Sequence, residues 1–190
     1  MSLTVFRVAH GKLVAQNAEA PLTTATAGAS LKALGIAASV TIAGGTATVD
    51  LPGATADQIA EIVYTLTQFP TVQRVDVGGK TGLTRADVDP SYLPQISIES
   101  PASGASVSKT IHVTGTAQVF EATFILELQI QGKTMVKQTI TATVGAPSRG
   151  TFDATITSPS TGPVDLVAFE PSAADGSPLH TVTVPLDVTQ

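Results

Sequence analysis

The sequence predicts two domains of different fold class, an α+β domain followed by an all-β immunoglobulin-like sandwich. Residues 55–69 carry a strongly periodic apolar helix pattern, whereas only short β-type runs follow Pro94. Between them, residues 78–94 lose periodicity and gather Gly, Asp and Pro, which is typical of a linker. Because 190 residues suffice for two domains of ordinary size, we expect domains at 1–90 and 91–190.

The start of the first half mixes strand and helix signals. Residues 3–9 predict a strand, and Gly11 marks a turn before residues 13–15. Residues 26–34 are rich in alanine and carry Leu31 and Leu34 three positions apart, which favours a helix that stops at Gly35.

A hairpin and a second helix complete the first half. Residues 40–51 alternate on both sides of Gly44-Gly45, a pair that supplies the positive φ angles of a two-residue turn. Thr55 and Gln58 then have capping-box spacing, and the helix is expected to end at Phe69, before Pro70. With a strand at 71–77, the first half predicts two helices on a sheet of three or more strands.

The second half predicts a β-sandwich because seven short β runs occur in about a hundred residues. The alternation from Val119 to Phe124 predicts a half-buried strand with Phe120 and Phe124 on the core face and Glu121 outside. The core Trp and paired cysteines of antibody domains are absent. The expected strands are 96–99, 111–116, 119–131, 134–144, 151–157, 164–170 and 181–188.

Composition excludes several classes of function. The net charge of −5 argues against a nucleic-acid partner, which would need a basic face. The second half is the more acidic, with 4 Lys+Arg against 8 Asp+Glu after Pro90. Cysteine is absent, which removes disulfides, thiolate metal sites and cysteine nucleophiles. No apolar run reaches the roughly 18–20 residues of a membrane span.

No catalytic, cofactor or metal site is predicted. Ser106 to Lys109 and Lys80 to Gly82 resemble fragments of penicillin-recognising enzymes, but in reversed order. The three histidines are far apart in sequence and none has a second ligand nearby. The candidate binding residues are Glu121, Asp175 and Ser177, expected on loops at one end of the sandwich. The alternative for these residues is a turn at Asp175-Gly176 and a solubilising role for Glu121.

The chain resembles a GerMN domain followed by the immunoglobulin-like module associated with it in sporulation and spore-germination proteins. Residues 47–51, 58–69 and 72–77 carry the first resemblance. The second rests on residues 100–101, 115–117, 119–122, 149–152 and 175–177. One departure is that Leu34-Gly35 runs almost directly into residues 38–42, where family members have a longer segment.

The resemblance implies a non-enzymatic, extracytoplasmic protein, usually a lipoprotein. Its expected partners are envelope proteins, spore coat or cortex proteins, or the cell wall. The start at Met1-Ser2-Leu3 leads directly into a strand, as expected where an export segment and anchor have been removed. The GerMN resemblance implies a fold like ring-building modules, yet we expect a monomer in isolation. The alternatives are a module that binds peptidoglycan or polysaccharide, and a hydrolase with dispersed carboxylates.

Overall fold

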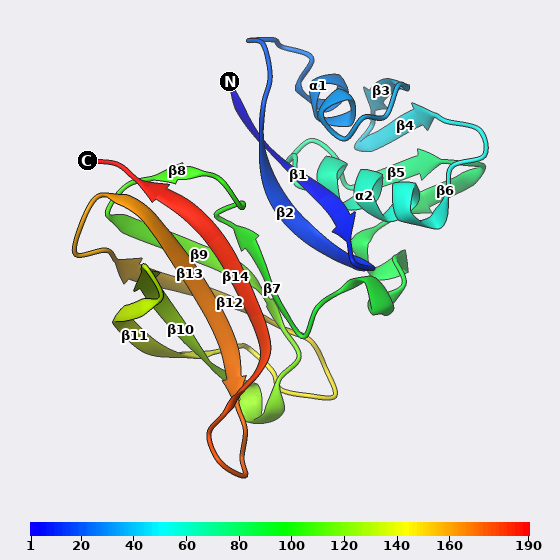
Figure 1. The fold of residues 1–190 in the computed structure, drawn as a ribbon. Coiled ribbons are helices and arrows are strands. Elements are labelled where there is room, and N and C mark those ends of the chain that lie inside the picture. The colour runs from blue at the N-terminus through cyan, green and yellow to red at the C-terminus, as the bar shows by residue number, and fades with distance from the viewer. The chain divides into compact units, whose positions relative to one another are not determined.

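The computed structural model describes all 190 residues, and they divide into two compact units, Met1–Leu93 and Pro94–Gln190 (Figure 1). The first unit thus runs three residues past the expected limit at Pro90. No helix in the chain has both the length and the apolar character needed to cross a membrane.

The first unit is α+β, as the sequence predicts. Its four-stranded sheet has the order β3-β4-β5-β6, and β1 pairs with β2 in a separate antiparallel hairpin. The elements are β1 (Ser2–Ala9), β2 (Lys12–Glu19), α1 (Thr26–Ala33), β3 (Ser39–Ala43), β4 (Thr46–Asp50), α2 (Ala56–Leu66), β5 (Arg74–Val77) and β6 (Lys80–Leu83). The β3–β4 turn is Gly44-Gly45, with φ of 55° and 79°, which confirms the predicted hairpin.

Helix α2 lies at the centre of the first unit, between the β1–β2 hairpin and the larger sheet. The predicted capping box is present, because the Gln58 N–H donates to Thr55 Oγ1 (3.2 Å) and the Thr55 N–H donates to Gln58 Oε1 (3.0 Å). Packing on two sides buries more than the predicted stripe. Tyr64 and Thr65 are also buried, and Thr65 Oγ1 accepts the N–H of Phe6 (2.9 Å).

The predicted end of α2 at Phe69 was wrong, because the helix ends at Leu66. The Thr67 hydroxyl donates to the Val63 carbonyl (2.6 Å), and the Phe69 N–H donates to the Leu66 carbonyl (3.1 Å) in a tighter turn. Pro70 already disfavours helical geometry at Phe69. The chain therefore leaves the helix one turn earlier than the apolar spacing indicates.

The predicted linker over residues 78–94 was also wrong. Residues 80–83 form β6, which pairs with β5, and short 3-10 turns follow at Arg85–Asp87 and Pro90–Tyr92. These elements are too short for a periodic pattern, and their turns use the Gly, Asp and Pro that imitate a linker. Asp76 stabilises β6 by accepting the Gly82 N–H (2.7 Å).

The second unit is an all-β sandwich, as predicted. Its sheets have the orders β11-β10-β13-β14-β8 and β12-β9-β7. The strands are β7 (Ile96–Ser100), β8 (Ser106–Val107), β9 (Thr110–Ala117), β10 (Thr123–Ile130), β11 (Lys133–Thr141), β12 (Gly150–Thr157), β13 (Gly162–Pro171) and β14 (Pro178–Val188). The two-residue β8 was not predicted, because so short a run carries no alternation.

The core of the second unit is a set of apolar side chains between the two sheets. Phe124, Leu126 and Leu128 of β10 are fully buried there. The rings of Phe124 and Phe152 meet edge to face with their centres 4.9 Å apart. Gly115 of β9 permits this packing, since a Cβ there would lie 2.7 Å from the Phe152 ring.

Phe120 does not lie in this core, and the predicted strand from 119 to 131 was wrong at its start. Residues 120–122 form a 3-10 turn in which Glu121 and Ala122 have φ of 53° and 59°. That turn breaks the alternation and leaves Phe120 65% exposed, whereas Phe124 is buried. The turn is held from outside the segment, because Glu170 Oε1 accepts the Phe120 N–H (2.7 Å).

Candidate functional site

The predicted binding residues lie on loops at one end of the second unit. Glu121 is exposed in the turn before β10, and Asp175 and Ser177 are exposed in the loop between β13 and β14. The end of β13 lies beside the start of β10, since Phe169 pairs with Ile125. The topology therefore places all three residues at the same end of the sandwich.

Asp175 and Ser177 form hydrogen bonds with each other within the β13–β14 loop. Asp175 Oδ1 accepts both the N–H (3.0 Å) and the hydroxyl (2.7 Å) of Ser177. These hydrogen bonds, with a further one from Ser172, hold the pKa of the Asp175 carboxyl below its ordinary value. The loop is therefore preorganised, with a carboxylate that is ionised at neutral pH.

A hollow of about 230 Å³ lies beside Glu121. Glu121 and Phe120 line it from the turn before β10, and Glu170, Ser172 and Ala173 line it from the end of β13 and the loop that follows. Asp175 and Ser177 do not line it. The sequence pattern predicted Phe120 in the core and did not single out Glu170 as a binding residue. The alternation on each side of residues 120–122 continues without a visible break, so the turn that exposes Phe120 could not be recognised.

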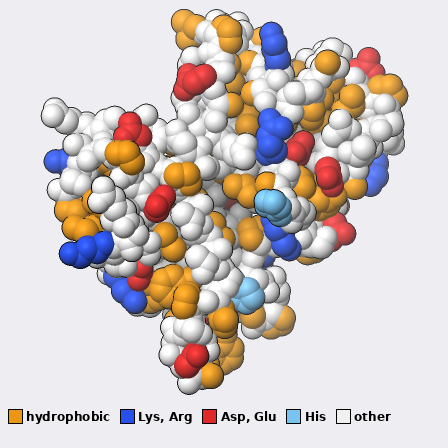
Figure 2. Space-filling view, in the orientation of Figure 1, with side chains coloured by type: hydrophobic (Ala, Val, Ile, Leu, Met, Phe, Trp, Pro, Cys, Tyr) orange, Lys and Arg blue, Asp and Glu red, His pale blue; other side chains and the backbone are white.

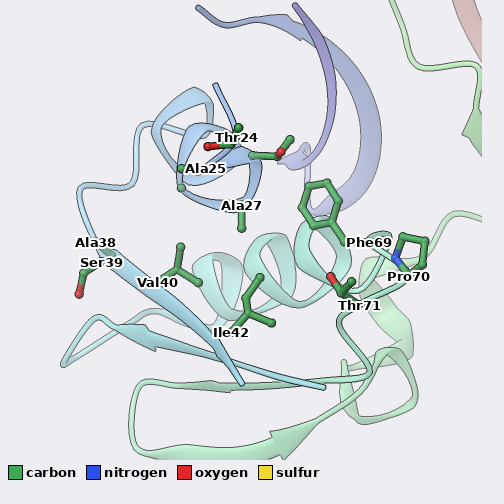
Figure 3. Close-up of a pocket in the computed structure, with 12 residues that line it drawn as sticks. Thr24, Ala25, Ala27, Ala38, Ser39, Val40, Ile42, Phe69, Pro70 and Thr71 are labelled. Carbon is green, nitrogen blue, oxygen red and sulfur yellow. The ribbon is translucent and has the colours of Figure 1, made fainter. Parts of the chain in front are cut away.

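A second hollow lies in the first unit, and we call it the α1–β3 groove (Figure 3). It has a volume of about 620 Å³. Val40 and Ile42 project into it from β3, with Phe69 on the opposite side. The lining is Thr24, Ala25, Thr26, Ala27, Gly28, Ala38, Ser39, Val40, Ile42, Phe69, Pro70 and Thr71, so no ionisable side chain lines it.

The groove exists because the helical layer leaves part of the sheet uncovered. Val40 and Ile42 pair with Val49 and Ala47, whose side chains are buried on the helix side of the sheet. Helix α1 spans only eight residues, and Ile42 stays 43% exposed. Strand β3 is also an edge strand that contains neither charge nor proline, the two common protections against pairing with another chain. The groove and this edge together suit an extended apolar segment.

Groups with catalytic chemistry do not assemble into a working site. His112 Nε2 lies 2.6 Å from Asp153 Oδ1, but both side chains are largely exposed on the face of the β12-β9-β7 sheet. Ser106 stands in the two-residue strand β8 rather than at a helix start, where a penicillin-recognising enzyme needs its nucleophile. No group of three or more His, Cys, Asp or Glu side chains could hold a metal ion.

Together these features define a two-module protein, an α+β domain followed by an immunoglobulin-like sandwich, with surfaces suited to binding. Residues 7–80 match the family described as sporulation and spore germination. Residues 95–177 match the family described as the immunoglobulin-like domain of bacterial spore germination. Each of the two domains thus matches one of these families, and together they indicate a protein of the sporulation and spore-germination type. Neither family is a known enzyme family.

Other comparisons add little. No curated protein matches this chain. One solved structure that resembles it is the crystal structure of an engineered protein at 1.98 Å resolution, with 19% sequence identity and a TM-score of 0.36. That match covers 57% of this chain and 24% of the engineered protein.

Proposed function

We propose that this protein is a non-enzymatic, extracytoplasmic component of the sporulation or germination machinery that acts through contacts with envelope or spore proteins. The observation that carries the proposal is the α1–β3 groove. This groove of about 620 Å³ has no acid, base or nucleophile stronger than an alcohol in its lining, so it suits docking better than hydrolysis. The membership of both domains in families that are not known enzyme families supports the same conclusion.

The groove can be tested with a cross-linker. A photoreactive amino acid in place of Ile42 is expected to capture an envelope or spore protein in extracts of sporulating cells. The matched control places the same group at Leu22, an apolar residue that is 91% exposed and lies outside the groove. Equal capture at both positions would contradict the docking role of the groove.

A wall-binding module and a hydrolase are the competing functions, and purified cell-wall sacculi separate them. If this protein contacts only other proteins, it should not cosediment with sacculi and should not release muropeptides from them. Cosedimentation without release would favour a wall-binding module instead. Release that is lost on substitution of carboxylates would identify a hydrolase.

We further propose that the full-length protein is anchored outside the cytoplasm as a lipoprotein. The expectation comes from the GerMN resemblance of residues 7–80. A lipobox cysteine upstream of this segment, with incorporation of labelled fatty acid, would support the anchor. Recovery of the full-length protein in the cytoplasm would contradict it.

In isolation, we propose that the protein is a monomer. The acidic second unit makes copies repel one another, although salt screens this beyond about 8–10 Å. Assembly would then need an anchor to raise the local concentration. Sedimentation at micromolar concentration is the test, and a stable ring there would favour a channel-scaffold function.

A further inference from the structure

Three large apolar side chains are exposed at the loop end of the second unit. Phe120, Val144 and Leu179 are 65%, 45% and 43% exposed. Glu170 links two of them, because it accepts the Phe120 N–H (2.7 Å) and pairs with Leu179 across β13 and β14. The segment that carries Val144 contacts the residue before Phe120, since the Ala146 N–H donates to the Val119 carbonyl (2.9 Å).

Carboxylates surround these apolar groups, and we call the whole region the acidic loop end. It comprises Phe120, Glu121, Val144, Glu170, Asp175 and Leu179. Figure 2 shows hydrophobic, acidic and histidine side chains together where the β13–β14 loop lies. The histidine of this end is His180, whose Nε2 lies 3.8 Å from Glu170 Oε2.

No lysine or arginine of the second unit neutralises the acidic loop end. Arg149, the one arginine of the second unit, donates to the Pro94 carbonyl (2.8 Å) and to Thr116 Oγ1 (3.2 Å). Lys109 and Lys133 lie at the other end of the sandwich, where β9 and β11 begin. Lys137 lies in mid-strand, 3.4 Å from Glu127. The potential at the acidic loop end is therefore negative over an apolar surface.

We propose that the acidic loop end binds a basic segment of a partner protein. An arginine or lysine of that segment would lay its aliphatic stem on the Phe120 ring and place its charge between Glu121 and Glu170. An exposed aromatic ring beside carboxylates favours an arginine or lysine side chain. The face of the ring attracts the cation, and the carboxylates form charge-assisted hydrogen bonds with the same cation. Leu179 and Val144 would contact apolar side chains next to the basic residue. The inference rests on the proposed contact function but uses a surface separate from the α1–β3 groove.

The preorganised backbone favours such a contact. Glu121 is held by the hydrogen bonds of its neighbours, since the Ala142 N–H donates to the Ala122 carbonyl (2.8 Å). Gly145 packs against the same turn, where a Cβ would lie 2.7 Å from the Ala122 nitrogen. Because the turn is ordered before binding, little conformational entropy is lost on association.

The test is direct binding of a defined probe to the full chain. The probe is a fluorescent peptide with repeated Leu-Arg pairs, and its matched control carries neutral citrulline in place of arginine. Fluorescence anisotropy is expected to show binding of the arginine peptide alone, weakened at about 0.5 M salt. Phe120→Ala and Glu121→Gln should each weaken it about two- to fivefold.

Two substitutions elsewhere serve as controls. Met135→Ala removes an exposed apolar side chain, and Asp187→Asn removes an exposed carboxylate, both away from the acidic loop end. Neither should change the affinity, and unchanged melting temperatures will show that all four variants fold. Absence of binding, equal binding of the citrulline peptide, or equal loss in the control variants would overturn the proposal. So would binding of amine-bearing wall fragments without binding of the arginine peptide. These outcomes are independent of cross-linking at Ile42.

Discussion

The guanidinium of Arg85 lies over the ring of Tyr64, with its central carbon 4.7 Å from the ring centre. It also lies 5.3 Å from the centre of the Phe6 ring. Arg85 Nε donates to Thr67 Oγ1 (3.0 Å), and one terminal nitrogen donates to the Tyr64 carbonyl (3.3 Å). One side chain thus attaches the segment after β6 to both β1 and the end of α2.

Replacement of Arg85 tests this attachment. Arg85→Ala should destabilise the first unit by about 1–3 kcal/mol, because the cation–ring contacts and charged hydrogen bonds are lost together. Arg74→Ala, at an exposed arginine on β5, is the matched control and should cost under about 0.5 kcal/mol. Urea unfolding measures both, and equal costs would contradict the role assigned to Arg85.

The burial of α2 predicts unequal effects within one helix. Leu66 is fully buried, so Leu66→Ala should cost about 2–5 kcal/mol. Gln58 is half-buried and its side chain contributes one capping hydrogen bond, so Gln58→Ala should cost only about 0.5–1 kcal/mol. Chemical denaturation of both variants is the measurement. Similar losses would mean that α2 does not pack as described.

Gly115 should tolerate no side chain. A Cβ there would lie 2.0 Å from the Ser97 carbonyl oxygen, which belongs to the paired strand β7 and cannot withdraw without breaking that pairing. Gly115→Ala should therefore destabilise the second unit by at least about 3 kcal/mol or prevent its folding. Gly28→Ala is the contrasting control in α1, where the nearest atom is 3.9 Å away and about 0.5–1 kcal/mol should be gained. A well-folded Gly115→Ala protein would contradict the close approach of β7 and β9.

The surroundings of the Glu127 carboxyl predict that the stability of the second unit depends on pH. Burial by itself would raise its pKa, but hydrogen bonds from Gln129, Thr134 and Lys137 hold the pKa below its ordinary value of 4.5. A lowered folded-state pKa stabilises the fold above about pH 4.5, and this contribution is lost as the pH falls through the folded-state pKa.

Glu127→Gln should accordingly destabilise the protein by roughly 1–3 kcal/mol at neutral pH and by less in acid. Urea unfolding from neutral pH down to about pH 2.5 gives the difference between variant and parent protein. Asp187→Asn, at an exposed carboxylate, is the control and should show little difference at any pH. A Glu127→Gln deficit that stays constant on acidification would exclude the charge as its cause.

The two units are expected to fold as separate domains. Since β6 is paired with β5 and Arg85 attaches the segment that follows, we expect limited proteolysis to cut near Pro94, where the two units divide, and not within residues 78–87. The products should be two folded fragments with separate unfolding transitions. Resistance to protease throughout this segment, with one cooperative transition, would show a single folding unit instead.

Local patterns predicted most of the elements because their signals are local. The capping box at Thr55 and Gln58 and the Gly44-Gly45 turn each depend on residues within one turn of chain, and both are present. The spacing of short β runs likewise predicted the sandwich. The resemblance to the two germination domains was confirmed along the chain in the expected order.

Two of the failures involve contacts between residues far apart in sequence. Phe120 continues the alternation of its neighbours, yet Glu170, fifty positions later, accepts its N–H in a turn that leaves the Phe120 ring exposed to solvent. Residues 78–94 resemble a linker, yet Arg85 attaches them to Tyr64 and Phe6. Neither outcome could be read from a local pattern, because the partner is supplied only when the chain has folded.

The sequence by itself determined the fold class of each half, its principal helices and strands, and the families to which they belong. Only the tertiary structure decided which apolar side chains stay exposed, and therefore where binding surfaces form. Ile42 and Phe120 carry the same hydrophobic signal as buried residues, and they differ only in what packs over them. Alternation indicates the face on which a side chain lies, whereas exposure depends on whether another element covers that face.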